Sequence, residues 1–107
     1  MYVLAGVGGC GATGDGDVMM RFLPCYQAVE SMRLGATPEQ AAADAMARIA
    51  ERYPAFRGGI VVADATGTRH AGAANGWTFT YSLSSMATDG KVAVFTVEPP
   101  SASITST

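Results

Sequence analysis

The spacing of apolar residues changes from a helical period to a period of two near Pro54, and this change limits the fold class. Before Pro54, one stripe repeats at i, i+3, i+4, i+7 and i+11, and it comprises Ala42, Ala45, Met46, Ile49 and Tyr53. After Pro54, the runs GIVVAD, HAGAA, WTFTYSL and KVAVFTV are typical of strands. Helices grouped ahead of strands predict an α+β fold in which two helices cover one face of a mainly antiparallel sheet.

The second helix has the clearest start signal in the chain. Thr37 and Gln40 form a capping box, and Pro38 occupies the first helical position. On this helix we expect Asp44 and Arg48 to form an ion pair, because they are four residues apart.

Small apolar residues dominate the first part of the chain. Residues 2–12 indicate one tightly packed strand. A helical pattern begins at Asp17, is kinked or ended by Pro24, and continues to Gly35. The predicted order of elements is therefore β-α-α-β-β-β-β.

Length and charge restrict the domain organisation and the partners. The chain has 107 residues, which suits one domain, and we assign residues 1–98 to it and residues 99–107 to a disordered tail. Seven basic and nine acidic residues give a net charge of −2, which argues against a nucleic-acid partner. No apolar run approaches the roughly 20 residues of a membrane span. The start MYVLAGVGG has no basic region, so it does not resemble a signal peptide, and its abrupt entry into a strand suggests an incomplete chain.

The two cysteines and the single histidine do not form a recognisable site. Cys10 and Cys25 match neither a zinc pattern nor a C-x-x-C motif, so we interpret them as buried free thiols in a reducing compartment. A disulfide between them is compatible with the sequence, which does not reveal their geometry. His70 has no Cys/His cluster around it and is assigned a structural or surface role. We expect no metal and no cofactor.

The stretch GGCGATGDGD contains Gly9, Gly11 and Gly14 in the spacing G-x-G-x-x-G between a strand and a helix. A dinucleotide site also needs an acidic residue at the end of a second strand, and Glu30 lies in a helical stretch instead. A calcium loop starting at DGD needs glutamate at its twelfth position, which is Tyr26.

Two interpretations of this stretch remain. The backbone N–H groups of residues 14–17, with the hydroxyl of Thr13, can form an anion or oxyanion site at the start of a helix. Alternatively, the glycines are required only by packing.

The stretches GGCGATGDGDVMMRFLPCYQAVESMRLG, RIAERYPAFRGGIVVADATG and HAGAANGWTFTYS resemble the glycosylasparaginase and plant-type asparaginase family of N-terminal nucleophile hydrolases. The resemblance extends from about Gly6 to Glu98. It implies half of a four-layer αββα sandwich. It also implies a precursor that cuts itself before a threonine, which then attacks the side-chain amide of an asparagine-type substrate with its own amino group as the base.

The resemblance also implies roles for the glycine-rich loop. Thr13 and Gly14 would form the oxyanion hole, and the carbonyl of Gly16 would accept a hydrogen bond from the α-amino group of the substrate. Asp15 occupies the variable position of this substrate-binding loop.

Two departures from the family pattern concern catalysis. No Asp-Thr pair occurs in the sequence, and the family's Arg-x-Gly-Asp segment, which binds the α-carboxylate and α-amine, is absent. The chain therefore corresponds to the C-terminal part of the small subunit, with no catalytic residue of its own. Its expected partners are the large subunit, the rest of the small subunit and a substrate (glycosylasparagine, L-asparagine or an isoaspartyl peptide). The alternative is an inactive remnant that only binds or assembles.

The resemblance also guides the expected compartment and surface. The cysteines that pair in lysosomal animal members are replaced here by alanine and valine, which favours the cytoplasm; a lysosome or vacuole is the alternative if a signal peptide precedes the chain. Because two helices cover one sheet face only, we expect the face with Trp77, Phe79, Tyr81 and Leu83, or the outer face of the GIVVAD strand, to lack a cover.

Overall fold

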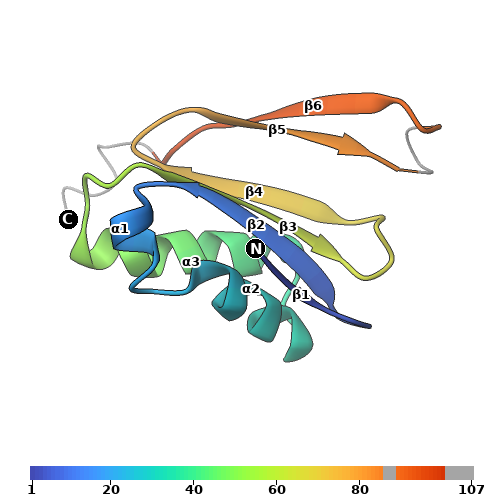
Figure 1. The fold of residues 1–107 in the computed structure, drawn as a ribbon, viewed down its shortest axis with the longest axis horizontal. Helices are drawn as coiled ribbons and strands as arrows, with labels where there is room; N and C mark the ends of the chain where they lie inside the picture. Colours follow the sequence, from blue (N-terminus) through green and yellow to red (C-terminus); the bar gives the residue numbers. More distant parts are fainter. Residues whose placement is uncertain (86–88, 101–107) are drawn as a thin grey trace.

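The computed structural model describes residues 1–85 and 89–100 and has three layers (Figure 1). Helices form one outer layer, a four-stranded sheet lies in the middle, and a two-stranded sheet forms the other outer layer. The elements in chain order are β1 (Tyr2–Leu4), β2 (Gly8–Gly14), α1 (Gly16–Met19), α2 (Pro24–Arg33), α3 (Pro38–Arg52), β3 (Gly58–Asp64), β4 (His70–Asn75), β5 (Phe79–Ser84) and β6 (Val92–Val97). The α+β class and the antiparallel sheet predicted from the sequence are confirmed.

The four-stranded sheet has the order β1-β2-β3-β4, and each neighbouring pair is antiparallel. Its helix-facing side and the helices α2 and α3 form the hydrophobic core. The largest side chains that are fully buried there are Val29, Ile49, Ile60 and Val62. Burial of each contributes roughly 1.5–3 kcal/mol relative to exposure.

The start of α3 agrees with the capping box. The Thr37 hydroxyl accepts a hydrogen bond from the Gln40 N–H at 3.1 Å, and the Gln40 side chain accepts one from the Thr37 N–H at 3.1 Å. The expected Asp44–Arg48 ion pair does not form. Arg48 instead donates to the Phe22 carbonyl at 2.9 Å and lies over the Phe22 ring. The Phe22 carbonyl and ring together bind the Arg48 guanidinium more favourably than an exposed ion pair with Asp44, which would contribute a few tenths of a kcal/mol.

The N-terminal part of the chain differs from the predicted order. The apolar run is folded into two strands, β1 and β2, because a turn at Gly6 (φ +81°) reverses the chain, and the Val7 N–H donates to the Leu4 carbonyl at 3.0 Å. The helical pattern after Asp17 is likewise divided, into the single turn α1 and the longer α2. The observed order is β-β-α-α-α-β-β-β-β.

The hairpin of β5 and β6 covers part of the second face of the four-stranded sheet. Phe79 and Tyr81 point toward this face, where they contact Gly59 and Gly72 respectively. The alternation predicted for β5 is therefore confirmed, but the expectation that its apolar face lacks a cover is wrong. Because Gly59 and Gly72 have no side chains, the rings of Phe79 and Tyr81 can pack closely on the backbone of the four-stranded sheet.

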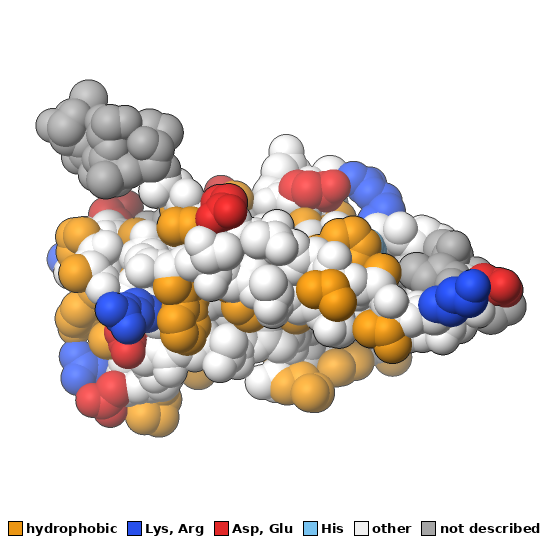
Figure 2. Space-filling model, turned by 90° about the horizontal axis from the view of Figure 1, so that it is seen from above, with side chains coloured by type: hydrophobic (Ala, Val, Ile, Leu, Met, Phe, Trp, Pro, Cys, Tyr) orange, Lys and Arg blue, Asp and Glu red, His pale blue; other side chains and the backbone are white. Residues whose placement is uncertain are grey.

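One part of the second face remains open. Over β1 and β2 it carries Val3, which is 68% exposed, and the exposed Thr13. The outer face of the hairpin also exposes Val92 and Val94, at 69% and 66%. Seen from the hairpin side, the hydrophobic side chains are separated by polar and backbone atoms (Figure 2).

His70 joins the two sheets. Its Nδ1 lies 2.8 Å from the Tyr81 hydroxyl, and its ring packs against Phe95 with centroids 4.7 Å apart. Burial, with a smaller effect from the charge of Glu39, raises the pKa of Tyr81, so the phenol keeps its proton and can donate to His70. The structural role expected for His70 agrees with these contacts.

Two further expectations concern the ends of the chain and membranes. Of the predicted tail, residues 101–107 lie outside the described residues, and residues 99–100 follow β6 without regular structure. Within the described ranges, no helix is long and apolar enough to cross a membrane.

Packing of the hairpin can be tested with Gly59→Ala. The added methyl group would lie 2.6 Å from the Phe79 ring, so we expect the free energy of unfolding in urea to fall by about 1–3 kcal/mol. The matched control is Gly11→Ala on β2, whose methyl group would meet only a Val61 side-chain carbon at 3.8 Å. Equal losses for both variants would show that Phe79 does not pack on Gly59.

Candidate functional site

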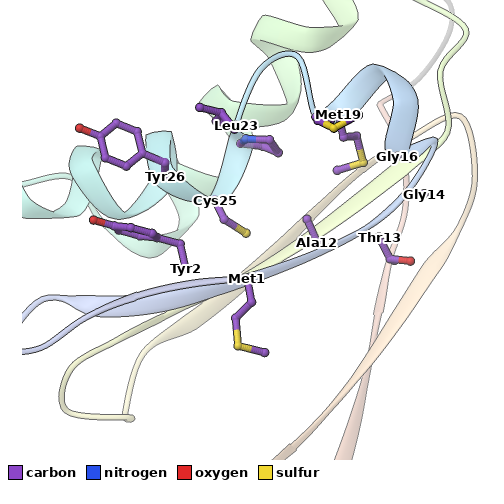
Figure 3. Close-up of a pocket in the computed structure, with 12 residues that line it drawn as sticks. Met1, Tyr2, Ala12, Thr13, Gly14, Gly16, Met19, Leu23, Cys25 and Tyr26 are labelled. Carbon is purple, nitrogen blue, oxygen red and sulfur yellow. The ribbon is translucent and has the colours of Figure 1, made fainter.

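A cavity of about 450 Å³ opens between the end of β2 and the helical segment that follows it (Figure 3). Its lining combines the glycine-rich loop with apolar side chains and, among the described residues, has no charged side chain. The lining residues are Met1, Tyr2, Ala12, Thr13, Gly14, Gly16, Met19, Met20, Leu23, Pro24, Cys25 and Tyr26.

The register of the sheet directs part of the β2 backbone away from β3. The Asp15 N–H donates to the Arg57 carbonyl at 2.8 Å, and bonded and non-bonded pairs alternate along an antiparallel ladder. The N–H and C=O groups of Ala12 and Gly14 therefore point away from β3, toward the β1 side. The pairs between β1 and β2 run from Tyr2 and Cys10 to Leu4 and Gly8.

Gly14 and Gly16 have different physical reasons for being glycine. Gly14 has a φ of +133°, and an added Cβ would collide with the carbonyl of Arg57, so packing alone requires glycine there. At Gly16 an added Cβ would meet no atom within 4 Å. Because packing does not explain Gly16, the open space beside it is available to a ligand.

Asp15 fastens the loop instead of lining the cavity. Its carboxylate accepts a hydrogen bond from the Arg57 N–H at 2.9 Å, while its own N–H is used by the sheet. Its carbonyl accepts from the N–H groups of Val18 and Met19. The expected row of available donors from residue 14 to 17 is therefore interrupted at Asp15, because this residue continues the β2–β3 ladder. A contact of Asp15 with substrate stays a prediction.

The remaining loop residues point in different directions. The Thr13 side chain lies on the opposite sheet face from Ala12, as alternation along a strand requires (Figure 3). The Gly16 carbonyl accepts the Met20 N–H at 2.8 Å and keeps a second lone pair. The N–H groups of Gly16 and Asp17 occupy the first two positions of α1, where a helix offers no carbonyl partner. The structure thus places Thr13, Gly14 and Gly16 on one loop beside the cavity, and their oxyanion and substrate roles stay predictions.

Sequence reasoning missed the apolar wall. Tyr2 and Tyr26 meet edge to face with ring centroids 5.4 Å apart, and Leu23 adopts the left-handed conformation with φ 50°. The signal was present, because a residue before proline is disfavoured in a helix and Leu23 precedes Pro24. Arg21 fixes this wall to α3 by donating to the Tyr53 hydroxyl at 2.8 Å.

The two cysteines form a disulfide between β2 and the second residue of α2. The interpretation of Cys10 and Cys25 as free thiols is therefore wrong. The folding of α2 directly across β2 brings their Cα atoms to 5.2 Å, a proximity that their spacing of 15 residues does not reveal. No group of three or more His, Cys, Asp or Glu side chains that could hold a metal ion occurs in the part of the chain that the structure describes.

The role of Asp15 can be tested by comparing Asp15→Ala with Asp15→Asn. Alanine removes the acceptor of the Arg57 N–H, so we expect the free energy of unfolding to fall by about 1 kcal/mol and the Arg57 amide to exchange faster. Asparagine keeps an oxygen acceptor in place and should behave like the unchanged chain. Protection of the Arg57 amide in Asp15→Ala would contradict this role.

The chain is similar to known proteins over most of its length. The family model described as asparaginase matches residues 2–93. A probable isoaspartyl peptidase/L-asparaginase 3 of Arabidopsis thaliana is 61% identical over 93 residues, which are 87% of this chain and 25% of the relative. An N(4)-(beta-N-acetylglucosaminyl)-L-asparaginase of Rattus norvegicus is 49% identical over 61 residues, covering 57% of this chain and 18% of the relative. A putative N(4)-(beta-N-acetylglucosaminyl)-L-asparaginase of Drosophila melanogaster is 42% identical over 93 residues, which are 86% of this chain and 24% of the relative.

The family match runs from β1 into β6 and includes the whole glycine-rich loop. The chain spans a quarter or less of the length of these three relatives. By this match, the chain belongs to the asparaginase family of amidohydrolases.

Proposed function

We propose that this chain supplies the oxyanion-stabilising and substrate-binding loop of an asparaginase-type amidohydrolase. The observation that carries the proposal is the backbone of Gly14, which points away from β3 and forms part of the cavity lining. Gly16 supports it, because nothing in the packing requires glycine at that position. A loop of this kind can place backbone groups close to a small polar substrate.

In the proposed reaction a nucleophile attacks the side-chain amide carbonyl of the substrate, and negative charge develops on the carbonyl oxygen. The Gly14 N–H and the Thr13 hydroxyl stabilise this charge, which is a preorganised form of electrostatic catalysis. The Gly16 carbonyl accepts a hydrogen bond from the substrate's α-amino group. Asp15 holds the loop in place through Arg57.

The nucleophile of the proposed reaction is an N-terminal threonine from outside these 107 residues. No Asp-Thr pair is present in the sequence. Among the described residues, the cavity lining also has no charged side chain that could bind the α-carboxylate of the substrate. We therefore propose that the chain alone does not hydrolyse substrate and that its partner contributes the nucleophile and a cation.

The proposed partner corresponds to the large subunit and the rest of the small subunit. The hairpin covers the sheet over β3 and β4 but leaves Val3 and Thr13 exposed over β1 and β2. Further strands beside the hairpin would cover this area, and helices would cover the exposed Val92 and Val94. The result would be the four-layer αββα sandwich, of which this chain has three partial layers.

For the substrate we propose L-asparagine or an isoaspartyl peptide, with glycosylasparagine as the alternative. The name and 61% identity of the Arabidopsis relative support this order. For the compartment, the expectation of the cytoplasm rests in part on free thiols at Cys10 and Cys25, which the structure does not have. The disulfide supports the alternative of a lysosome or vacuole reached through the secretory route, because disulfides form and persist in oxidising environments.

The proposal is tested by placing residues 7–97 into the corresponding segment of the Arabidopsis relative and measuring hydrolysis of L-asparagine and an isoaspartyl dipeptide. We expect an active chimera, whereas the isolated chain shows no turnover above background. Thr13→Ala in the chimera should lower kcat by about 10²–10³-fold, the usual loss for one oxyanion donor.

Two matched variants give the controls for this experiment. Thr13→Ser keeps the hydroxyl and should retain most of the activity. Thr68→Ala, in the turn between β3 and β4, should leave activity unchanged. A folded but inactive chimera would favour the alternative of a remnant that only binds or assembles, and activity in the isolated chain would show that it has its own nucleophile.

A further inference from the structure

The Cys10–Cys25 disulfide closes the loop that carries the whole candidate site. Cys10 lies in β2, ahead of Thr13, and Cys25 is the second residue of α2. The segment between them contains Thr13, Gly14 and Gly16, together with α1 and the lining residues Met20, Leu23 and Pro24. The bond therefore links the β2 side of the cavity to its helical side.

The disulfide can be reached from the cavity through one of its two residues. Cys25 is part of the cavity lining, whereas Cys10 is not, although both are mostly buried, at 7% and 5% exposure (Figure 3). A small thiol that enters the cavity therefore meets Cys25 first. After reduction, the Cys25 thiol lies in the first turn of α2, at the lining of the cavity.

Other contacts hold each side of the cavity separately. Asp15 fastens the end of β2 to β3 through Arg57. Arg48 and Arg21 fasten the helical wall to α3, through the Phe22 carbonyl and Tyr53 respectively. None of these polar contacts joins β2 to residues 16–23, and β2 and α2 otherwise meet through apolar packing. Loss of the disulfide should therefore loosen the loop without unfolding the sheet or α3.

We propose that the Cys10–Cys25 disulfide is a redox-controlled tie that sets the rigidity of the candidate site. This inference rests on the proposed function, because it takes the loop of residues 13–16 as the site. The reductant is a dithiol, either a small molecule or the active site of a dithiol protein. In the oxidised state the bond fixes the separation between β2 and the start of α2, and in the reduced state only apolar packing holds them together.

The exchange proceeds in two balanced steps. A thiolate of the dithiol attacks Cys25 Sγ, the bond between the two cysteines breaks, and Cys10 leaves as a thiolate that takes up a proton. The second thiol of the dithiol then attacks the mixed disulfide and releases Cys25. Two electrons and two protons pass to the protein, and the dithiol becomes a disulfide.

The test is hydrogen exchange of the full chain, followed by mass spectrometry, with and without dithiothreitol. We expect peptides within residues 11–24 to exchange about tenfold faster after reduction, because local opening becomes easier, while α3 is unchanged. Removing the dithiothreitol and adding its oxidised form should restore the slow exchange. Equal rates in both states, or resistance of the folded chain to reduction, would overturn the proposal.

The matched control is the double variant Cys10→Ala and Cys25→Ala. It should exchange like the reduced chain and should not respond to dithiothreitol. Equal acceleration in α3 after reduction of the unaltered chain would show a bond that stabilises the whole fold, which also overturns the proposal. This experiment uses no substrate, so its outcome is independent of the activity test. If the chimera is inactive but reduction still accelerates exchange in the loop, only the proposed function is overturned. If the chimera is active but reduction leaves exchange in the loop unchanged, only the redox control is overturned.

Discussion

The paired hydrogen bonds between Asp15 and Arg57 determine how the rest of the site is oriented. The Asp15 N–H bonds to the Arg57 carbonyl, and the Asp15 carboxylate accepts the Arg57 N–H. These bonds fix the phase of the β2–β3 ladder at its last position, so Gly14 must direct its backbone groups to the opposite side. A shift of one residue would direct them into β3 and remove them from the cavity. The direction of a backbone donor thus depends on a side chain that does not itself line the cavity.

The second constraint is the small size of the residues in the middle of the sheet. Gly59 and Gly72 allow the rings of Phe79 and Tyr81 to approach the backbone closely, and His70 adds a polar contact at the edge of the same layer. The opposite face of the same strands carries Ile60 and Val62, which are fully buried under the helices. The strand β3 therefore contributes to two layers, because successive side chains along a strand point to opposite faces of the sheet.

Much of this arrangement was predictable because its causes are local. Apolar periods gave the class of the fold and the strands after Pro54, and the residues at Thr37 and Gln40 defined the start of α3. What could not be predicted depends on contacts between distant segments. The spacing of Cys10 and Cys25 does not indicate that α2 crosses β2, and nothing local to Arg48 indicates a partner in the α1–α2 segment.

The same distinction applies to the glycine-rich loop. Its position between a strand and a helix was readable from the sequence, but the use of the Asp15 N–H by the sheet depends on the register with β3. The contrast between the two loop glycines has a consequence for how such a protein can evolve. A side chain at Gly14 would collide with the Arg57 backbone and destabilise the fold. A side chain at Gly16 would enter open space and alter only which ligands the cavity can hold. Selection on ligand preference can therefore act at Gly16 almost independently of selection on stability, so this position is a natural point at which related sequences can diverge in what they recognise.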